Sequence, residues 1–310
     1  MTRPSSPARL AGRTELAGGG LIALASAQFG VVVVLGKTVL EGGLAPHALL
    51  AVRFGVAALV LAGILAALRR PLLAARGERL RLAVLGSAGY GLEAWFFFAG
   101  LRHGTAAATT LLFFTYPVFV ALGSWLLGRG APGSVLALSL AAAVAGAAVV
   151  VGTSGGIAVE PLGAALALAA AATFSGYLLG AEAVLRRTDA LTGAVWTSAF
   201  ASLALAVSSL ASGAAVLPAE GSDLWRIAGM GLATAGAFVC LLNGLRLVGA
   251  VRAAIVSAME PLAAAVLAAV FLGERISAGT AAGGALILAG AVAASVARAR
   301  LPAEIGRAHV

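Results

Sequence analysis

Residues 244–273 read GLRLVGAVRAAIVSAMEPLAAAVLAAVFLG, and they repeat the outline of residues 100–128, GLRHGTAAATTLLFFTYPVFVALGSWLLG. Gly-Leu-Arg opens both stretches, Leu-Gly closes both, and the two opening glycines are 144 positions apart. Pro117 and Pro261 occupy the same place within the two copies. A match of this length indicates that one structural unit is written twice along the chain.

The whole chain is apolar enough to lie mostly inside a lipid bilayer. Hydrophobic residues make up 61% of its 310 residues and charged residues only 11%, against about 45–50% and about 25% in soluble domains. Crossing the hydrocarbon core takes about 20 consecutive apolar residues. Ten segments meet this requirement: 18–39, 46–68, 82–101, 106–127, 135–151, 162–183, 192–212, 227–247, 251–271 and 280–296.

Each copy of the repeat contains five of these segments, and Gly146 and Gly290 continue the match into the fifth segment of each. Because five is an odd number, the second unit must enter the membrane from the opposite side. Many secondary transporters are built from inverted repeats of this kind. We therefore expect an all-α membrane protein with ten transmembrane helices, arranged as two inverted five-helix repeats.

The predicted domain organisation follows from these segments. A cytoplasmic N-terminal tail covers residues 1–17, the first repeat 18–152, the second repeat 161–297, and a cytoplasmic C-terminal tail 298–310. The N-terminal tail resembles the start of a signal peptide, but the apolar run behind it is too long for a signal core of about 7–15 residues. Residues 304–310, EIGRAHV, match the translation of a common sequencing adapter, so we suspect that they are not native.

The net charge of +9 is explained by orientation in the membrane. With a cytoplasmic N-terminus, sixteen of the 21 basic residues fall in inner segments, three in outer segments and two within spans. This distribution obeys the positive-inside rule and places both termini in the cytoplasm of a bacterial cell, with the chain in the inner membrane. No soluble basic domain remains to bind nucleic acid.

The order of the motifs resembles the drug/metabolite transporter superfamily, in particular its EamA-type members. The pieces that carry the resemblance are Lys37, Pro46, Arg53-Phe54, Glu260-Pro261, Leu272-Gly273-Glu274, Gly283-Gly284 and Gly290. Two positions depart from the family pattern: Tyr116-Pro117 replaces a Glu-Pro pair, and Arg129 follows Leu127-Gly128 where the family often has glutamate. The resemblance implies transport of small metabolites by alternating exposure of a central cavity, without a cofactor.

Two glutamates are the leading candidates for the transport site. Glu93 lies about eleven residues into the third predicted span and Glu260 about nine into the ninth, so both fall near the bilayer midplane at about 1.5 Å per residue. An ionisable residue there costs about 2.5–3.5 kcal/mol on insertion scales and marks function by default. We expect these two acids to bind a proton or a substrate amine. The alternative is a neutral acid that hydrogen-bonds a neighbouring helix.

Aromatic and amide side chains are expected beside these acids. Tyr90 shares a helix face with Glu93, Trp95 lies round the side of the same helix, and Tyr116 occupies the repeat position that matches Glu260. Aromatic faces beside acids suit an amphipathic amine or amino acid through stacking and cation–π contacts. Gln28 and Asn243 complete the candidate substrate and proton site, although polar groups in spans also serve as bonds between helices.

Four further residues are candidates for kinks or gates. Pro117 and Pro261 are expected in mid-helix, where proline removes a backbone hydrogen bond and bends the helix. Lys37 is one turn before Glu41 near the outer end of the first span, which suits an anchor or a gate. Arg53 is about 10 Å deep in the second span, so it should pair with an acid or with carbonyls and could attract anionic groups of a substrate.

Other classes of function are weaker readings of the sequence. The three histidines lack partners at ligand spacing, so no metal site or membrane enzyme is predicted. No Walker-type glycine loop is present, which argues against an ATP-driven pump. A passive facilitator or channel with the same fold remains the alternative to a proton-coupled exporter. The expected partners are a small-molecule substrate, lipid and protons, and the sequence leaves open whether two copies form a homodimer.

Overall fold

The computed structural model describes residues 7–128, 134–152, 159–184, 187–213, 221–257 and 259–299. Residues 1–6 of the predicted N-terminal tail and residues 300–310, which include the suspected adapter-derived end, lie outside the described residues. Within the described ranges the secondary structure is helical, and the extended pairing consists of one isolated bridge between Gly104 and Val159. The predicted all-α class therefore agrees with the structure.

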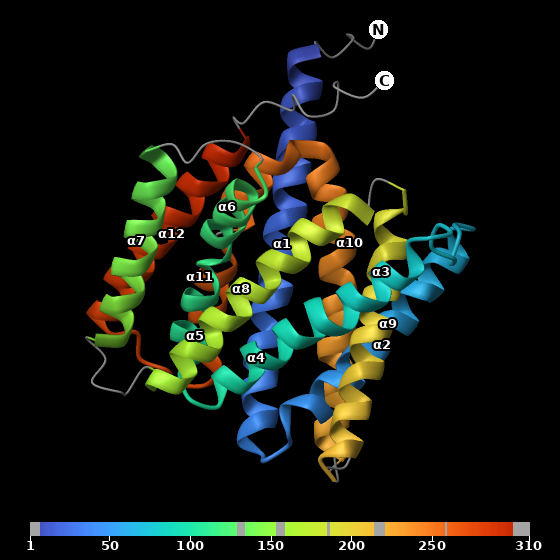
Figure 1. The fold of residues 1–310 in the computed structure, drawn as a ribbon, viewed down its shortest axis with the longest axis horizontal. Helices are drawn as coiled ribbons and strands as arrows, with labels where there is room; N and C mark the ends of the chain where they lie inside the picture. Colours follow the sequence, from blue (N-terminus) through green and yellow to red (C-terminus); the bar gives the residue numbers. More distant parts are fainter. Residues whose placement is uncertain are drawn as a thin grey trace, which may run out of the picture.

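Twelve α-helices and one π-helical segment, η1, follow one another along the described chain (Figure 1). They are α1 (Pro7–Glu41), α2 (Pro46–Ala67), α3 (Arg79–Val84), η1 (Leu85–Gly91), α4 (Leu92–Leu101), α5 (Ala106–Phe113), α6 (Tyr116–Leu126), α7 (Ser134–Gly152), α8 (Pro161–Val184), α9 (Ala190–Ala211), α10 (Gly221–Ser257), α11 (Met259–Phe271) and α12 (Ala278–Ala299).

Among the described residues, 7 helical segments are long and apolar enough to cross a membrane. They are Leu16–Glu41, Pro46–Ala67, Arg79–Leu101, Ala106–Leu126, Pro161–Ala181, Ala190–Ala211 and Asp223–Gly244. Three shorter apolar helices accompany them: Ala137–Gly152, Met259–Phe271 and Ala278–Ala293. The chain is a multi-pass helical membrane protein.

Three predicted spans are divided in the structure. The third consists of α3, η1 and α4, and the fourth consists of α5 and α6, separated at Phe114 and Thr115. The predicted ninth span, Val251–Phe271, is shared between the end of α10 and α11, so its expected start at Val251 is wrong. A 37-residue helix covers this boundary because residues 245–255 carry no proline and only one glycine to end it.

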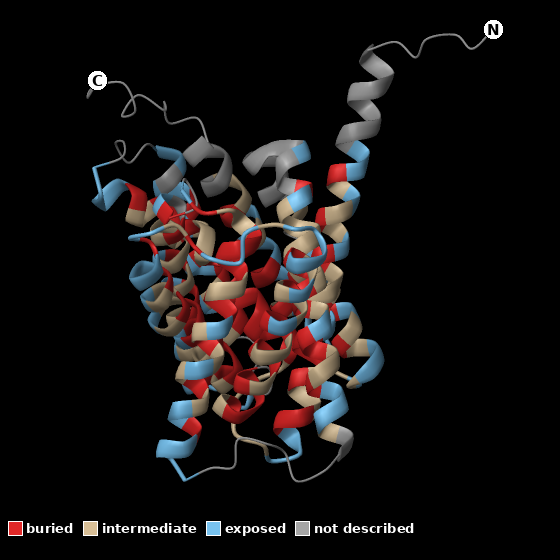
Figure 2. Cartoon of the chain, turned by 90° about the vertical axis from the view of Figure 1, so that its right-hand side faces the viewer, coloured by how far each residue is buried: buried red, intermediate tan, exposed pale blue. Residues whose placement is uncertain are grey.

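Buried residues gather along the axis of the bundle (Figure 2), and many large apolar side chains are exposed on its outer surface. Leu59 of α2, Leu210 of α9 and Val270 of α11 are 75%, 68% and 69% exposed. In water such a surface would be an aggregation liability, but lipid chains solvate it at no cost. Helices that are apolar on every side are typical of membrane proteins.

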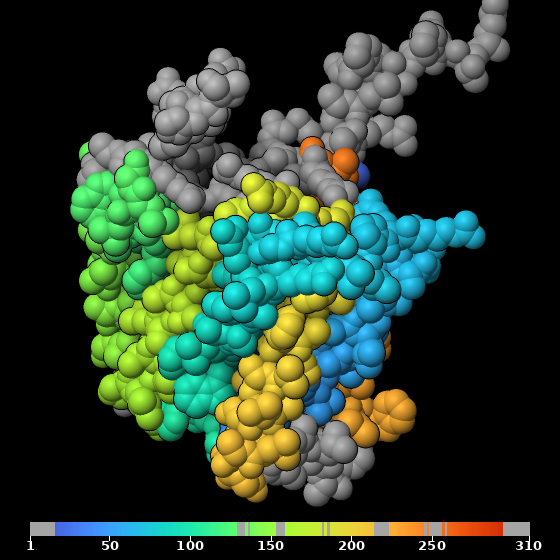
Figure 3. Space-filling view, turned by 45° about the vertical axis from the view of Figure 1, so that its right-hand side comes forward, coloured from blue at the N-terminus to red at the C-terminus, as the bar shows by residue number. Residues whose placement is uncertain are grey.

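The helices pack in pairs that recur between the two halves of the chain. α1 packs along α10 and α8 packs along α4, whereas α2 pairs with α9 and α7 with α12. In Figure 1 the α7–α12 pair forms one edge of the bundle, and α2 and α9 lie at the opposite edge. Figure 3 shows α4 lying between α8 and α9 on one face of the molecule.

The α7–α12 pair depends on glycine. A Cβ placed at Gly146 would lie 2.6 Å from the carbonyl oxygen of Gly283, and a Cβ at Gly283 would lie equally close to the oxygen of Gly146. These distances leave no room for a side chain, so the two backbones touch. Close approach through small residues is the ordinary way in which membrane helices associate.

Candidate functional site

A cavity of about 450 Å³ lies between the two halves of the chain. Its walls come from α1, α2, η1, α4, α5, α6, α8, α10 and α11, and the side chains that the following paragraphs use are Phe29, Arg53, Tyr90, Glu93, Phe97, Phe98, Phe113, Tyr116, Phe174, Tyr177, Phe238 and Glu260. Cavities of about 300–1,000 Å³ with apolar walls and a few polar groups are the common form of small-molecule sites.

Both candidate glutamates line this cavity. Glu93 is in the first turn of α4 and is only 7% exposed, whereas Glu260 is in the first turn of α11 and is half-buried. They come from opposite halves of the chain, 167 positions apart, and the folded structure brings them to one space.

Arg53 of α2 lines the same cavity and is 5% exposed. Its Nε donates a hydrogen bond to Thr234 Oγ1 at 3.0 Å, and its guanidinium carbon lies 4.8 Å and 5.3 Å from the ring centres of Phe54 and Phe98. The sequence predicted a pair with an acid or with carbonyls. In the described part of the chain, no carboxylate lies within 4.0 Å of this guanidinium.

Aromatic rings form much of the remaining wall. Tyr116 packs edge-on against Phe174 with ring centres 5.0 Å apart, Phe97 packs against Phe113 at 5.2 Å, and Tyr90 contacts Tyr177 at 5.3 Å. Such faces hold apolar groups and also attract cations.

Sequence reasoning did not assign Phe174 or Phe238 to the site. Phe174, Tyr177 and Leu178 follow the i, i+3, i+4 spacing of one helix face. That spacing was the available signal for α8, but it does not say whether the face meets the cavity or lipid.

Pro117 does not bend a continuous helix as predicted, because α5 ends at Phe113 and this proline lies in the first turn of a new helix, α6. Pro117 is the second residue of α6, and Pro261 is the third residue of α11. Proline has no amide N–H, so it fits a first turn, where that donor has no partner within the helix. A helix break therefore replaces the kink expected at Pro117, whereas the kink at Pro261 stays a prediction, because Ala258 just before α11 lies outside the described residues.

The carbonyl at the first break is bonded across the bundle. Ser175 of α8 donates to the carbonyl oxygen of Tyr116 at 2.9 Å. The sequence predicted that prolines would release carbonyls beside Glu260 and Tyr116, and here a neighbouring helix satisfies one of them.

Three predicted site residues lie outside the cavity lining. Trp95 packs against Phe96, with ring centres 5.4 Å apart, and the Gln28 amide packs against Gly236 of α10. Asn243 is exposed, and its amide donates to Val239 O of its own helix at 2.7 Å. The structure therefore brings Glu93, Glu260, Tyr90 and Tyr116 together and leaves these three apart.

Lys37 does not line the cavity and holds the turn between α4 and α5. Its Nζ donates to the carbonyl oxygens of Leu101 and Gly104 at 2.6 Å and 2.7 Å, and Glu41 is 3.7 Å away. An ammonium at the C-terminal end of α4 also complements the dipole of that helix.

Two other segments hold the same turn. Glu274 accepts from the amides of Ala106 and Ala107 at 2.7 Å and 3.3 Å, so it caps the start of α5. His103 Nδ1 lies 2.9 Å from Glu160 Oε2, and Glu160 N donates to His103 O at 2.7 Å. The capping role of Glu274 was missed, because it joins segments 168 positions apart.

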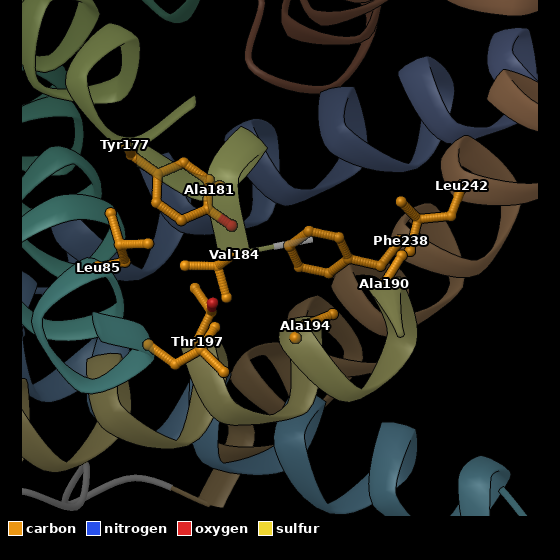
Figure 4. A pocket seen from close by; sticks show the side chains of 11 residues that line it. Leu85, Tyr177, Ala181, Val184, Ala190, Ala194, Thr197, Phe238 and Leu242 are labelled. Atoms are coloured by element: carbon orange, nitrogen blue, oxygen red, sulfur yellow. The ribbon is translucent and has the colours of Figure 1, made fainter. Parts of the chain in front are cut away.

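A small side pocket of about 50 Å³ adjoins the cavity between η1, α8, α9 and α10 (Figure 4). Tyr177 and Phe238 line both spaces and separate them. Leu85, Ala194 and Leu242 give the pocket an apolar wall, with Thr197 as one hydroxyl. The volume is small, since one water in bulk occupies about 30 Å³.

Among the described residues, no group of three or more histidine, cysteine, aspartate and glutamate side chains gathers as metal ligands would. The fold and the cavity therefore define a class: a multi-pass helical membrane protein that encloses a solute-sized, partly charged space between its two halves.

Comparison with known proteins gives the family. The model of the EamA-like transporter family matches residues 16–152 and again residues 161–296, so the chain belongs to this family of membrane transporters. The resemblance seen in the sequence is thus confirmed. None of the curated proteins matches the chain.

Solved structures share the fold: 15 chains match. One of them, described only as "Crystal structure of protein", aligns with a TM-score of 0.65 and 21% identity over 94% of this chain and 99% of that one. Similarity at this level of identity supports the fold alone.

Proposed function

We propose that this chain is a secondary transporter of the inner membrane that moves small amphipathic metabolites by alternating access, as a proton-coupled exporter. The observation that carries the proposal is the central cavity, in which Glu93 and Glu260 come from opposite repeats and aromatic rings supply an apolar wall. Sites at the interface of two repeats, near the bilayer midplane, are the usual design of secondary transporters.

The proposed architecture is ten spans in two inverted repeats. In support of it, the contact of α1 with α10 has its counterpart in the contact of α8 with α4, as an exchange of the two halves requires. The start of α1 and the end of α12 lie on one side of the bundle, which an even number of crossings demands (Figure 1). The arginine distribution makes that side cytoplasmic.

With this orientation, the structure corresponds to a transporter whose cavity is closed on the outer side. The cavity is lined by Ala25 of the Leu16–Glu41 span, Ala181 of α8 and Leu242 of α10, which belong to the halves of these segments nearest the proposed cytoplasmic face. The turn between α4 and α5 lies at the opposite end, where Lys37 and Glu274 hold it. Opening to the outside would require these bonds to separate.

Proton coupling is assigned to the two acids. Enclosing a carboxyl group among aromatic rings costs less free energy when the group is neutral, that is, when it holds a proton. A solute with a positive group can replace the proton at the same carboxyl. Exchange of the two at Glu260 or Glu93 would couple export to the inward flow of protons.

The test is uptake into inside-out membrane vesicles, whose interior is acidified so that a proton-coupled exporter drives solute inward. A panel of radiolabelled amino acids and amines is offered to vesicles with the natural chain, Glu93→Gln or Glu260→Gln. Asp223→Asn is the matched control, since Asp223 pairs with Arg226 at the start of α10, outside the cavity. Protein amounts are equalised by immunoblot.

We expect uptake of at least one solute that depends on the proton gradient and falls at least tenfold in Glu260→Gln or Glu93→Gln, but not in Asp223→Asn. Uptake that persists without a gradient and is unchanged in both cavity variants would favour a passive facilitator instead. Absence of uptake for every solute, together with no release from preloaded vesicles, would contradict transport of this class of metabolite.

A further inference from the structure

The most unusual group in the cavity is a buried cation, Arg53, that forms no ion pair with a carboxylate among the described residues. Arg53 is 5% exposed. Of its five N–H donors, the one on Nε donates a hydrogen bond to Thr234. Burying an unpaired guanidinium is costly, so such groups are normally matched by an anion. Within the described residues no carboxylate is close enough to do this.

The position of Arg53 is set by its surroundings before any ligand arrives. Thr234, which accepts from Nε, donates in turn to Met230 O at 2.8 Å. The rings of Phe54 and Phe98 flank the guanidinium, and a Cβ at Gly231 would lie 2.9 Å from Arg53 O, so α10 touches α2 at this level. A preorganised fork of donors loses little freedom when it binds an anion.

The charges around the cavity are separated by sign. Arg53 is on α2, whereas the two carboxyls are on α4 and α11, and apolar rings fill the wall between these elements. The cation and both acids are near enough to influence one another electrostatically without forming an ion pair. A complementary solute carries a negative group, a positive group and an apolar body.

We propose that Arg53 binds the carboxylate of the transported solute, which makes the substrate class an amino acid with an apolar or aromatic side chain. The guanidinium holds the carboxylate by two parallel N–H···O bonds, a cavity glutamate receives the ammonium group, and the aromatic wall contacts the side chain. This inference rests on the proposed function and narrows it by excluding simple amines and cationic dyes.

The test measures binding directly, by the ligand-induced rise in melting temperature of the purified, detergent-solubilised chain. The probes are the apolar amino acids, with phenylalanine compared with phenethylamine, which lacks the carboxylate, and 3-phenylpropionate, which lacks the amine. The variants are Arg53→Gln and Arg53→Lys, and Arg275→Gln is the control, because Arg275 is exposed and does not line the cavity.

We expect at least one apolar amino acid to bind roughly ten- to a hundredfold more tightly than its decarboxylated amine, as for a lost hydrogen bond to a charged group. Arg53→Gln should remove this preference and leave amine affinity within about twofold. Arg53→Lys, which keeps the charge but not the fork, should weaken the amino acid roughly tenfold. If Arg53→Gln fails to fold, Arg53→Lys decides the matter by the same comparison.

The proposal is overturned if the amine binds as tightly as the amino acid, if both weaken equally in the Arg53 variants, or if no apolar amino acid binds. The proposed function fails separately: vesicle flux of amines that survives in Arg53→Gln would keep the transporter and refute this site. Amino-acid binding that depends on Arg53 without any flux would keep the site and refute the transport mechanism.

Discussion

The two proline segments that border the cavity, Tyr116-Pro117 and Glu260-Pro261, occupy matching places in the two repeats but carry different side chains. α6 begins Tyr116-Pro117 and α11 has Glu260-Pro261 in its first turn, at matching places in the two repeats. Both tyrosine and glutamate face the cavity. The comparison separates what both repeats share, a proline in the first turn of α6 and of α11, from what only the second carries, an acid beside that proline.

The largest expected effect comes from giving the second proline segment the side chain of the first. Glu260→Tyr removes the carboxyl that loads a proton or a positive group, so we expect proton-driven uptake to fall at least tenfold and its pH dependence to disappear. Tyr116→Phe keeps the ring against Phe174 and should retain more than half of the activity. Vesicle uptake at two pH values measures both.

Equal losses of uptake in Glu260→Tyr and Tyr116→Phe would mean that the two proline segments are chemically equivalent and that the acid has no special role. Melting temperatures of both variants serve as the control for folding, since Tyr116 also contacts Phe113 and Phe114.

An intermediate effect is expected when the shared proline is removed. Pro117→Ala and Pro261→Ala each restore an amide N–H and relax the fixed φ angle, and at Pro117 this lets α5 extend across Phe114 and Thr115 into α6. We expect turnover to fall severalfold while substrate affinity stays within about twofold. Initial uptake rates over a range of substrate concentrations separate the two quantities.

Pro46→Ala is the matched control for these variants, because Pro46 also starts a helix, α2, but does not line the cavity. Stability should change by about 1 kcal/mol or less in all three, as for a proline at a compatible site. If turnover falls in Pro46→Ala as much as in Pro117→Ala and Pro261→Ala, the loss is a general effect of proline removal and not a role of the two prolines beside the cavity.

The smallest effect concerns the carbonyl at the first break. Ser175→Ala removes the hydroxyl that donates to Tyr116 O, although the same hydroxyl also donates to Ala171 O of its own helix. We expect a loss of about 0.5–1.5 kcal/mol of stability, as for one hydrogen bond. The midpoint of thermal unfolding in detergent reports this change.

Thr173→Val provides the control. Thr173 donates a hydrogen bond within α8 to Ala169 O at 2.8 Å, and valine has nearly the same shape as threonine. A Ser175→Ala midpoint equal to that of Thr173→Val would mean that the bond between α8 and the break contributes nothing measurable.

The sequence by itself determined the class of the fold and singled out the two acids that line the cavity. Apolar segment length, the repeat and the prolines are local signals, because a bilayer forces each span to satisfy its backbone alone. A glutamate in an apolar segment is conspicuous for the same reason, so Glu93 and Glu260 could be found without coordinates.

Only the tertiary structure decided which side chains share the cavity. Trp95 and Asn243 stand out in the sequence as clearly as Tyr90 does, yet they face elsewhere, while Phe174 and Phe238 line the wall. The reason is physical: the rotation of a membrane helix about its axis depends on contacts with distant helices, such as that of Gly231 with Arg53 O, and no local pattern encodes them.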